Sequence, residues 1–527
     1  MNRFLPVLLS LLLPAAAFSQ TPDEAEPVVH HDTVSFAALR SMMDAGLTEA
    51  REDILVEGVV ICDAWDRNKE QSLQLGYNQN RLAPNNKTTY LESYDGRYGF
   101  KLFFENEKDA AIELYSHLVL NVKGCKLRIV DGAYRIDDIP HGAVVEVNPG
   151  IDTNIPVKLR TAETITADDF YTVITVTDQE FVFKDGSFSN TAEVYGRHNE
   201  TNRGKFYVNS SMDGWATLTC SPQGTPLNLF INSRVGWRRQ GDGVPAGAGN
   251  IRGILVNASQ PRYGNCLGRW QLRPQQRSDL RFEKAAPSSF KTIAEWNWSD
   301  GGQSFSTTSG KLKNAAGAKI LADMGSGELS TDLPGQVLRG PEPNNREVTA
   351  ETKGYMETGA MSLQAASCDW WDWQEGGQPR GVSIEVSTKD ISASSVIFAF
   401  SFAGGFRNAA TSYAFPVYWK VEYSADGGPF VRVGDEYELH SLPWYWENNI
   451  EGVKYPMSLR AGMGYTEHIL NLPADAVCGH SSLVIRLSPA RRNISTLALD
   501  DYTRGAARPE NKTRCFVNFG AFAIRYR

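Results

Sequence analysis

The sequence predicts an all-β protein: two OB-like barrels, then a β-sandwich of the jelly-roll type, with a short helix near the N-terminus. Short strand-like runs divided by Gly- and Pro-rich turns recur along the chain and indicate the all-β class. In the first half, two sets of such runs each include a strand with an internal glycine, a pattern typical of small coiled barrels. In the second half, longer strands alternate apolar and polar residues, as sandwich strands do.

A signal peptide is predicted at residues 1–19. Arg3 supplies the positive charge, a short apolar run follows, and Ala17 and Ser19 offer the small residues that precede cleavage. The run is too short to remain as a membrane span, and no other stretch approaches spanning length. We therefore expect an exported chain without a transmembrane segment, and the absence of a cysteine in this region argues against a lipid anchor. It would be periplasmic or extracellular and cell-surface associated, and not a lipoprotein.

Residues 20–50 are predicted to form a leader and a short helix. The first part is acidic and contains proline, and from Val34 to Ala50 apolar side chains recur at helical spacing. Residues 51–160 are then predicted to form the first OB-like barrel. Its five predicted strands are ILVEGVVICDAW, GFKLFF, HLVLNVKGCKLRIV, YRIDDI and AVVEV, which begin at Ile54, Gly99, His117, Tyr134 and Ala143.

Residues 161–284 are predicted to form a second barrel of the same kind. Its strands are expected in VITVTDQEFVFKDGSFSN, GWATLTC, LNLFINSRVGW, NIRGILVNA and GRWQLRP. RGIL at 252–255 echoes EGVV at 57–60, each with a glycine inside a strand-like run, which favours a tandem of two similar units. The Pro- and Ser-containing segment 283–290 is the expected linker to the second half.

Residues 288–527 are predicted to form the sandwich. In VYWKVEY, Val417, Trp419, Val421 and Tyr423 share one face of a strand, and the ADGG that follows favours a hairpin turn. HILNLP, SSLVIRLS and CFVNFGAFAIRYR complete the set. Because the chain ends in a strand, we expect the last strand to lie beside the first strand of this domain.

A resemblance to a known family rests on three blocks within residues 50–283: VEGVVICD, TAETITADDFYTVITVTDQEFVFKDGSFSN and VPAGAGNIRGILVNASQPRYGNCLGRWQLRPQQRSDLRF. They resemble a domain of unknown function from secreted and surface proteins of Bacteroidetes-type bacteria. CDWWDWQEGG, VSIEVSTKDISASSVIFAFSF, WKVEYSADGGPFVRVGDEYEL and FVNFGAFAI resemble the jelly-roll domain often fused behind it. The resemblance implies tandem OB-like barrels and export, but no agreed activity. Many relatives carry a lipid-anchoring cysteine that this chain lacks.

The charge balance is mildly acidic. The 53 Lys and Arg against 61 Asp and Glu give a net charge of −8, and the acid excess is spread over both halves. A nucleic-acid backbone requires a basic face, so this balance argues against nucleic acid as a partner. The seven cysteines form no CxxC pair, so no metal site is predicted, and most are expected to be small buried hydrophobes. No cofactor is predicted.

Two aromatic clusters in the predicted sandwich are the candidate ligand-binding site. CDWWDWQEGGQPR and PWYWENN place flat rings beside Asp, Asn, Gln and Arg side chains. Such a ring covers the apolar face of a sugar while the polar groups bond its hydroxyls. The alternative is that the rings fill the ends of the sandwich core. The candidate residues are Trp370, Trp371, Trp373, Arg380, Trp444, Tyr445 and Trp446.

No catalytic residue is predicted. The motifs HExxH and GxSxG and a phosphate-binding loop are absent. The acid pairs Asp137–Asp138, Asp168–Asp169 and Asp500–Asp501 are neighbours in the chain, and neighbouring strand residues point to opposite faces. Such a pair does not by itself make a carboxylate dyad. For the last pair, a solvated turn is preferred over a calcium site.

The sequence therefore predicts an exported, non-catalytic binding protein that recognises a glycan or cell-surface polymer through the aromatic clusters. Two alternatives stay open: a secreted glycoside hydrolase or accessory chain of a secreted nuclease, and a structural or adhesive surface protein. Two close carboxylates in a cleft favour the enzyme, and buried Trp clusters favour the structural protein. An open groove lined by Trp371, Trp373, Trp444 and Trp446 favours binding.

Overall fold

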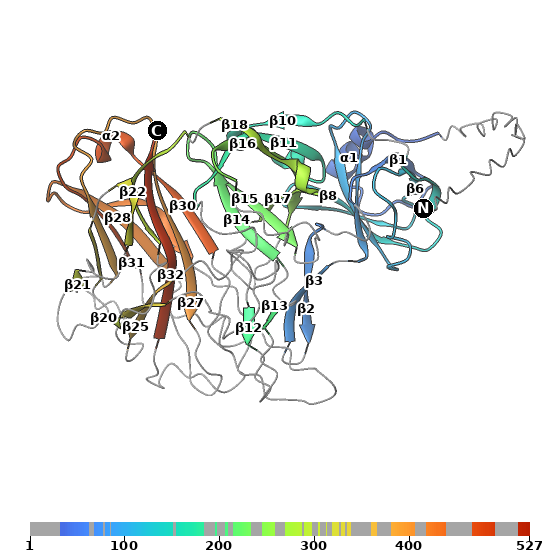
Figure 1. Cartoon of the computed structure of the whole chain (residues 1–527). Helices are drawn as coiled ribbons and strands as arrows, with labels where there is room; N and C mark the ends of the chain where they lie inside the picture. Colours follow the sequence, from blue (N-terminus) through green and yellow to red (C-terminus); the bar gives the residue numbers. More distant parts are fainter. Residues whose placement is uncertain are drawn as a thin grey trace, which may run out of the picture.

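The computed structural model is built of β-strands, with one short helix near the N-terminus and a helical turn late in the chain (Figure 1). The predicted all-β class is confirmed. No helix in the described part of the chain is long and apolar enough to cross a membrane. The structure describes residues 32–62, 68–76, 79–84, 86–150, 154–183, 195–197, 206–208, 214–232, 245–258, 269–286, 289–297, 304–305, 312–313, 319–325, 328–331, 335–338, 360–365, 381–405, 418–438, 466–490 and 515–527.

The first sheet is an OB-fold barrel, as predicted. Its strand order is β7-β8-β5-β4-β1-β6-β9. β5 runs parallel to β8, and the other neighbouring strands are antiparallel. β6 pairs with β1 and β7 pairs with β8, and residues 122–125 connect β6 directly to β7, so the chain itself joins the two ends of the β1-β4-β5-β8 path. The strands are β1 (Leu55–Val60), β4 (Thr88–Glu92), β5 (Gly99–Phe104), β6 (His117–Asn121), β7 (Lys126–Val130), β8 (Ala133–Ile139) and β9 (Val144–Asn148).

The second sheet repeats this barrel. Its order is β10-β11-β14-β15-β17-β16-β18, and the additional pairing of β11 with β16 closes the ring. β15 and β17 form the parallel pair of the ring, in the same place as β5 and β8. The strands are β10 (Lys158–Arg160), β11 (Val173–Phe181), β14 (Gly214–Cys220), β15 (Pro226–Asn232), β16 (Ala248–Asn257), β17 (Trp270–Arg273) and β18 (Leu280–Ala286).

The rings of the two barrels share one strand order, with β6 and β7 together in the place of β16, but they do not match through the two glycine-bearing runs that suggested the tandem. EGVV lies in β1, the first strand of its ring, whereas RGIL lies in β16, the fourth strand of its ring counted from β11. Each glycine has a separate cause. A side chain on Gly58 would lie 2.5 Å from the Glu92 carbonyl oxygen, and one on Gly253 would lie 2.8 Å from the Arg273 backbone. Close approach between strands therefore selects glycine in both places.

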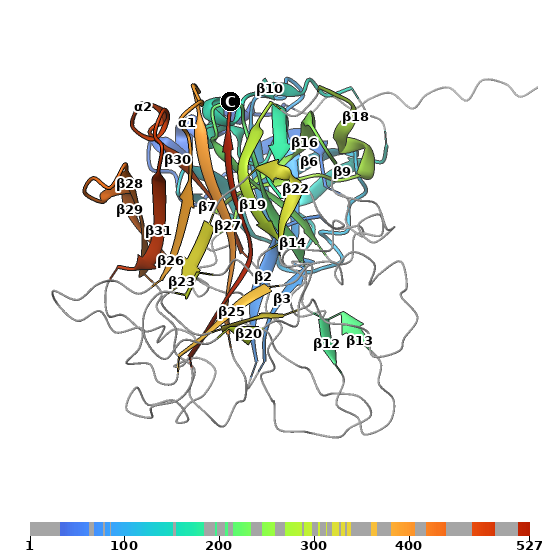
Figure 2. The same ribbon diagram turned by 60° about the vertical axis from the view of Figure 1, so that its left-hand side comes forward.

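Each barrel carries a hairpin between the first two strands of its ring, which are β1 and β4 in the first barrel and β11 and β14 in the second. In the first barrel this is β2 (Gln71–Gly76) with β3 (Gln79–Pro84), and in the second it is β12 (Tyr195–Arg197) with β13 (Phe206–Val208). The equivalent position of the two hairpins follows from the shared strand order. Both hairpins point to the same side of the molecule (Figures 1 and 2).

The N-terminal helix is shorter than its apolar pattern predicts. Helix α1 spans Phe36–Asp44, whereas the pattern extends to Ala50. It begins where the Ser35 hydroxyl accepts a hydrogen bond from the Ala38 amide, and it ends before Gly46, whose φ is +100°. The buried face of α1 joins the core of the first barrel, and the rings of Phe36 and Phe100 meet edge to face at 4.9 Å.

The second half is a sandwich of two sheets, as predicted. One sheet has six strands in the order β21-β23-β26-β31-β28-β29. The other contains the path β20-β24-β25-β32-β19-β22, with β27 between β32 and β30. The strands are β19 (Lys291–Asn297), β20 (Ser304–Phe305), β21 (Leu312–Lys313), β22 (Lys319–Gly325), β23 (Glu328–Thr331), β24 (Gly335–Leu338), β25 (Ala360–Ala365), β26 (Val382–Val386), β27 (Val396–Gly405), β28 (Tyr418–Ala425), β29 (Val431–Glu438), β30 (Thr466–Leu472), β31 (Leu483–Pro489) and β32 (Cys515–Tyr526).

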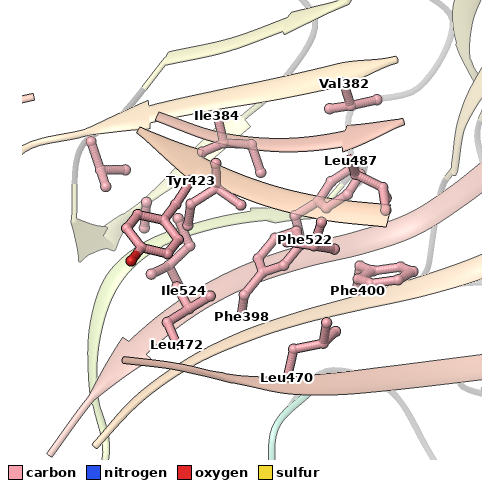
Figure 3. Packing of buried hydrophobic residues seen from close by; sticks show 14 of the residues in the cluster. Val382, Ile384, Phe398, Phe400, Tyr423, Leu470, Leu472, Leu487, Phe522 and Ile524 are labelled. Carbon is pink, nitrogen blue, oxygen red and sulfur yellow. The ribbon is translucent and has the colours of Figure 1, made fainter. Parts of the chain in front are cut away.

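The sandwich core lies between these two sheets. Figure 3 shows Phe398, Phe400 and Phe522 of one sheet facing Ile384 and Leu487 of the other. The last strand, β32, pairs with the first, β19, so the expected closure of the domain is confirmed. Of the face predicted for VYWKVEY, the three residues whose side chains are described are buried in this core: Trp419, Val421 and Tyr423. These rings and branched chains are typical of sandwich interiors.

Replacing Phe519 by Ala tests the sandwich core. This ring is fully buried and packs against the rings of Phe402 and Phe522 at 5.7 and 5.0 Å. We expect Phe519→Ala to lower the free energy of unfolding by about 3–5 kcal/mol, measured by urea titration. Val431→Ala on the exposed side of β29 is the matched control and should change it little. Equal effects of the two variants would contradict the described core.

Candidate functional site

The predicted ligand-binding residues lie outside the residues that the structure describes. This holds for Trp370, Trp371, Trp373, Arg380, Trp444, Tyr445 and Trp446. The strands on either side of them are described. The first cluster connects β25 to β26, and the second connects β29 to β30. The positions of these strand ends therefore define where each cluster is attached to the sandwich.

Both clusters are attached at the same end of the sandwich. In the six-stranded sheet, this end is marked by the pairs Val382–Leu487 and Trp419–Pro489, where β26 and β28 begin and β31 ends. β29 also ends there, since it pairs antiparallel with β28. In the other sheet, β25 and β27 end and β30 and β32 begin at the same end. Four long connections therefore leave this end: 366–380, 406–417, 439–465 and 491–514.

At the opposite end of the sandwich, the β26–β27 and β30–β31 connections are shorter and described. Residues 387–395 link β26 to β27, and residues 473–482 link β30 to β31 and include the turn α2 (Ala474–Val477). The Thr388 hydroxyl ties these two connections together by donating to the Val477 carbonyl at 2.6 Å. Both views place α2 and the chain's C-terminal end opposite β20 and β25, with the barrel hairpins on the side of β20 and β25 (Figures 1 and 2). Long connections on a rigid scaffold are where binding residues are most often placed.

The outer face of the first barrel, on β4 and β5, is covered by the second barrel. OB-folds commonly bind ligands on this face. Here Tyr90 and Lys101, paired across the two strands, are buried although they point away from the barrel interior. The Tyr90 ring stacks on the Tyr171 ring, with centroids 5.3 Å apart and planes 10° apart. A side chain on Gly99 would lie 1.9 Å from the Tyr171 carbonyl oxygen, so only glycine allows this approach.

Buried polar contacts join the same two barrels. The Asn68 amide donates to the carbonyls of Phe230 and Pro274 at 2.8 and 2.7 Å. The Arg273 guanidinium donates to the Lys69 carbonyl at 2.7 Å. These hydrogen bonds satisfy backbone carbonyls that the interface removes from water. Without the bonds, those carbonyls would be buried and unpaired. They fix the segment before β2 against β15 and β17 of the second barrel.

The interface also holds an ion pair and a strongly buried guanidinium. The Lys101 ammonium contacts the Glu70 carboxylate, and both side chains are more than nine-tenths buried. Burial, with a smaller effect of Arg135, lowers the pKa of Lys101, whereas contact with Glu70 favours its charged form. Burial also lowers the pKa of Arg273 to about 10, so this group keeps its charge at neutral pH. Its guanidinium lies 4.4 Å from the centre of the Phe230 ring.

The sandwich packs on the second barrel in turn. Val182, Cys220 and Phe290 form one apolar cluster with Ile397 and Ala523 on the outer face of the sandwich. A side chain on Gly224 would lie 2.1 Å from the Asn471 amide oxygen, which shows how closely the two surfaces approach. The Leu218 amide donates to the Glu467 carboxylate at 2.8 Å. This contact covers the outer side of β14, the counterpart of β4.

The segment expected as a linker is held in this second interface. Phe290 is buried, and both the amide and the hydroxyl of Ser289 donate to the Glu180 carboxylate at 3.1 Å. β18 extends to Ala286, so little chain separates the barrel from the sandwich. The connection therefore joins two packed units rather than spanning a gap.

The described acid pairs do not form carboxylate dyads. In each pair one residue is buried against cations and its neighbour is exposed: Asp137–Asp138 lies in β8, where alternation accounts for this, whereas Asp168–Asp169 lies in a 3-10 turn, Ala167–Asp169. Asp137 pairs with Arg135 at 3.0 Å, and Asp169 pairs with Arg160 at 2.9 Å. Asp500–Asp501 lies outside the described residues. Within the described residues, no group of three or more His, Cys, Asp or Glu side chains could hold a metal ion.

The described cysteines agree with the sequence prediction. Cys62, Cys125 and Cys220 are buried, and Cys478 is half-buried. Burial raises the pKa of Cys125 to about 12, which keeps this thiol protonated and unreactive. They behave as small core residues.

Comparisons with known proteins find very distant structural neighbours for a part of the chain. No family model and no curated protein matches the chain, so the family resemblance stays a prediction. A cleaved adhesin domain of Lys-gingipain from Porphyromonas gingivalis has 10% identity, with 44% of this chain and 97% of that chain covered and a TM-score of 0.20. A xylan-binding domain from Paenibacillus barcinonensis has 11% identity, 45% and 96% coverage and a TM-score of 0.18. Likeness at this level establishes no function.

Breaking the buried pair tests the contact between the barrels. Lys101→Met leaves the Glu70 carboxylate buried without its cation, so we expect the free energy of unfolding to fall by about 3–5 kcal/mol. Lys123→Met, which removes an exposed partner of Asp53, is the matched control and should have little effect. Urea unfolding measures both. A Lys101→Met protein as stable as the control would show that the pair is not buried between the barrels.

Proposed function

We propose that this chain is an exported, non-catalytic binding protein that recognises a glycan or another cell-surface polymer through the aromatic connections of its sandwich. The observation that supports this most directly is that both aromatic clusters are attached to one end of a rigid two-sheet scaffold. The outer faces on which OB barrels commonly bind ligands are occupied by contacts within the chain. The end of the sandwich is therefore the best candidate surface.

The chemistry of the two clusters fits a polymer of sugars. Trp371, Trp373, Trp444 and Trp446 supply flat apolar surfaces that match the C–H face of a pyranose ring. Arg380 and the neighbouring Asp, Gln and Asn residues supply hydrogen-bonding groups for hydroxyls. Because the clusters come from different connections of one end, a chain of several sugars could contact both.

The barrels are proposed to act as a spacer rather than as nucleic-acid modules. The face of the first barrel that would meet a nucleic-acid strand carries Tyr90, Glu92 and Lys101, all buried against the second barrel. The net charge of −8 also opposes a phosphate backbone. A stack of barrels that positions the sandwich away from the N-terminus suits an exported surface protein.

Two tryptophan substitutions test the proposed glycan site. We expect the full-length protein to shift its intrinsic Trp fluorescence saturably with at least one of a panel of soluble polysaccharides. Trp371→Ala and Trp446→Ala should each weaken that affinity about tenfold or more, because aromatic anchors dominate such contacts. Trp270→Ala is the matched control, since Trp270 is 39% exposed but lies on the second barrel.

The outcomes separate the candidate functions. Unchanged binding by the double variant Trp371→Ala/Trp446→Ala, with folding intact, would contradict the proposed site. No response to any polysaccharide would favour a structural or adhesive protein. Release of reducing ends from the bound polysaccharide would instead favour the glycoside hydrolase.

A further inference from the structure

Glu92 is a buried carboxyl group at the contact between the two barrels. It ends β4 on the outer face, and its side chain is completely shielded from solvent. One oxygen, Oε1, accepts a hydrogen bond from the amide of Val173, the first residue of β11, at 3.1 Å. The other oxygen, Oε2, is buried and has no hydrogen-bond partner among the described residues. A carboxylate in such a place would be strongly destabilised.

The cations of the described residues that act on Glu92 do not offset this burial. Lys158 of β10, Arg252 of β16 and Asp95 of the turn after β4 are the charged groups that act on Glu92. The ammonium of Lys158 is already bound by Asp169 at 2.9 Å and by the carbonyls of Arg97 and Asp168. Burial consequently raises the pKa of Glu92 well above its usual range.

Asp169 shows that burial alone does not keep an acid protonated in this region. It is as fully buried as Glu92, but Arg160 binds both of its oxygens, at 2.9 and 3.0 Å. Its hydrogen bonds outweigh the effect of burial, so its pKa is lowered. The two acids differ in having or lacking a bound cation. Ionisation of Glu92 would therefore disturb the contact between the barrels, whereas Asp169 is ionised within it.

We propose that the protonation state of the Glu92 carboxyl controls the contact between the two barrels. The protonated form stabilises the packing of the second barrel on the first, and ionisation weakens it. The proposal concerns the contact between the barrels and does not depend on the proposed function.

The sign of the pH dependence follows from the two states. When the contact opens, Glu92 returns to water and ionises with an ordinary carboxyl pKa, whereas in the closed state it keeps its proton. Opening therefore releases one proton between these two pKa values. The opening equilibrium rises about tenfold per pH unit over that interval and levels off above the raised pKa. Alkaline conditions thus weaken the contact, and mildly acidic ones strengthen it.

Hydrogen exchange of the full-length protein tests this directly. The Val173 amide, which donates to Glu92, reports opening of the contact, and the amides of β31 report unfolding of the sandwich. After correction for intrinsic exchange, we expect the protection of the Val173 amide to fall about tenfold per pH unit from about pH 5 upward. The protection of β31 should stay nearly constant, so the wild-type protein alone gives an answer.

Two variants complete the experiment. Glu92→Gln should make the protection of Val173 independent of pH. Glu113→Gln, which removes an exposed carboxylate of the same barrel, should retain the wild-type slope. The proposal is overturned if Val173 protection in the wild type does not change with pH. A slope that Glu92→Gln leaves unchanged would overturn it equally.

Discussion

The arrangement of this protein depends on the burial of outer barrel faces by the next unit of the chain. Tyr90 of the first barrel stacks on Tyr171, and Cys220 of the second packs against Ile397 of the sandwich. Glycines at 99 and 224 allow these approaches, because a side chain at either place would overlap its neighbour. Packing of this kind joins the three units into one stack, in which Asn68 and Arg273 satisfy the backbone groups that the contact takes from water.

This constraint decides where a ligand could bind. Faces that are free in an isolated OB barrel are interior here, and the outer face of one sandwich sheet is covered by the second barrel. Our proposal therefore places the ligand at the end of the sandwich where four long connections begin and end. The two barrel hairpins lie on that same side of the molecule (Figures 1 and 2). This stack holds the strand ends to which the aromatic connections are attached at a fixed position relative to both barrels.

Much of the fold could be predicted from patterns along the chain. GFKLFF gave the bounds of β5, and alternation in VYWKVEY gave the buried face of β28. The sequence pattern does not predict the strand Thr88–Glu92. Every residue of this strand is buried, so its apolar and polar residues do not alternate. Glu92 and Lys101 are of residue types that are usually exposed to solvent, so the sequence does not predict their burial. They are buried where the second barrel packs on the first. Sequence identified both aromatic clusters, but their common end follows from strand order, which no local pattern contains.

Lysine labelling of the native full-length protein tests the stacked arrangement most directly. The Lys101 side chain is 7% exposed at the contact between the barrels, whereas those of Lys123 and Lys126 on the same barrel are 51% and 44% exposed. Brief treatment with an amine-reactive reagent, followed by mass spectrometry of the peptides, compares their rates. The stacked arrangement predicts rapid modification of Lys123 and Lys126 and protection of Lys101 until the protein is unfolded. Modification of all three at similar rates in the native protein would contradict it.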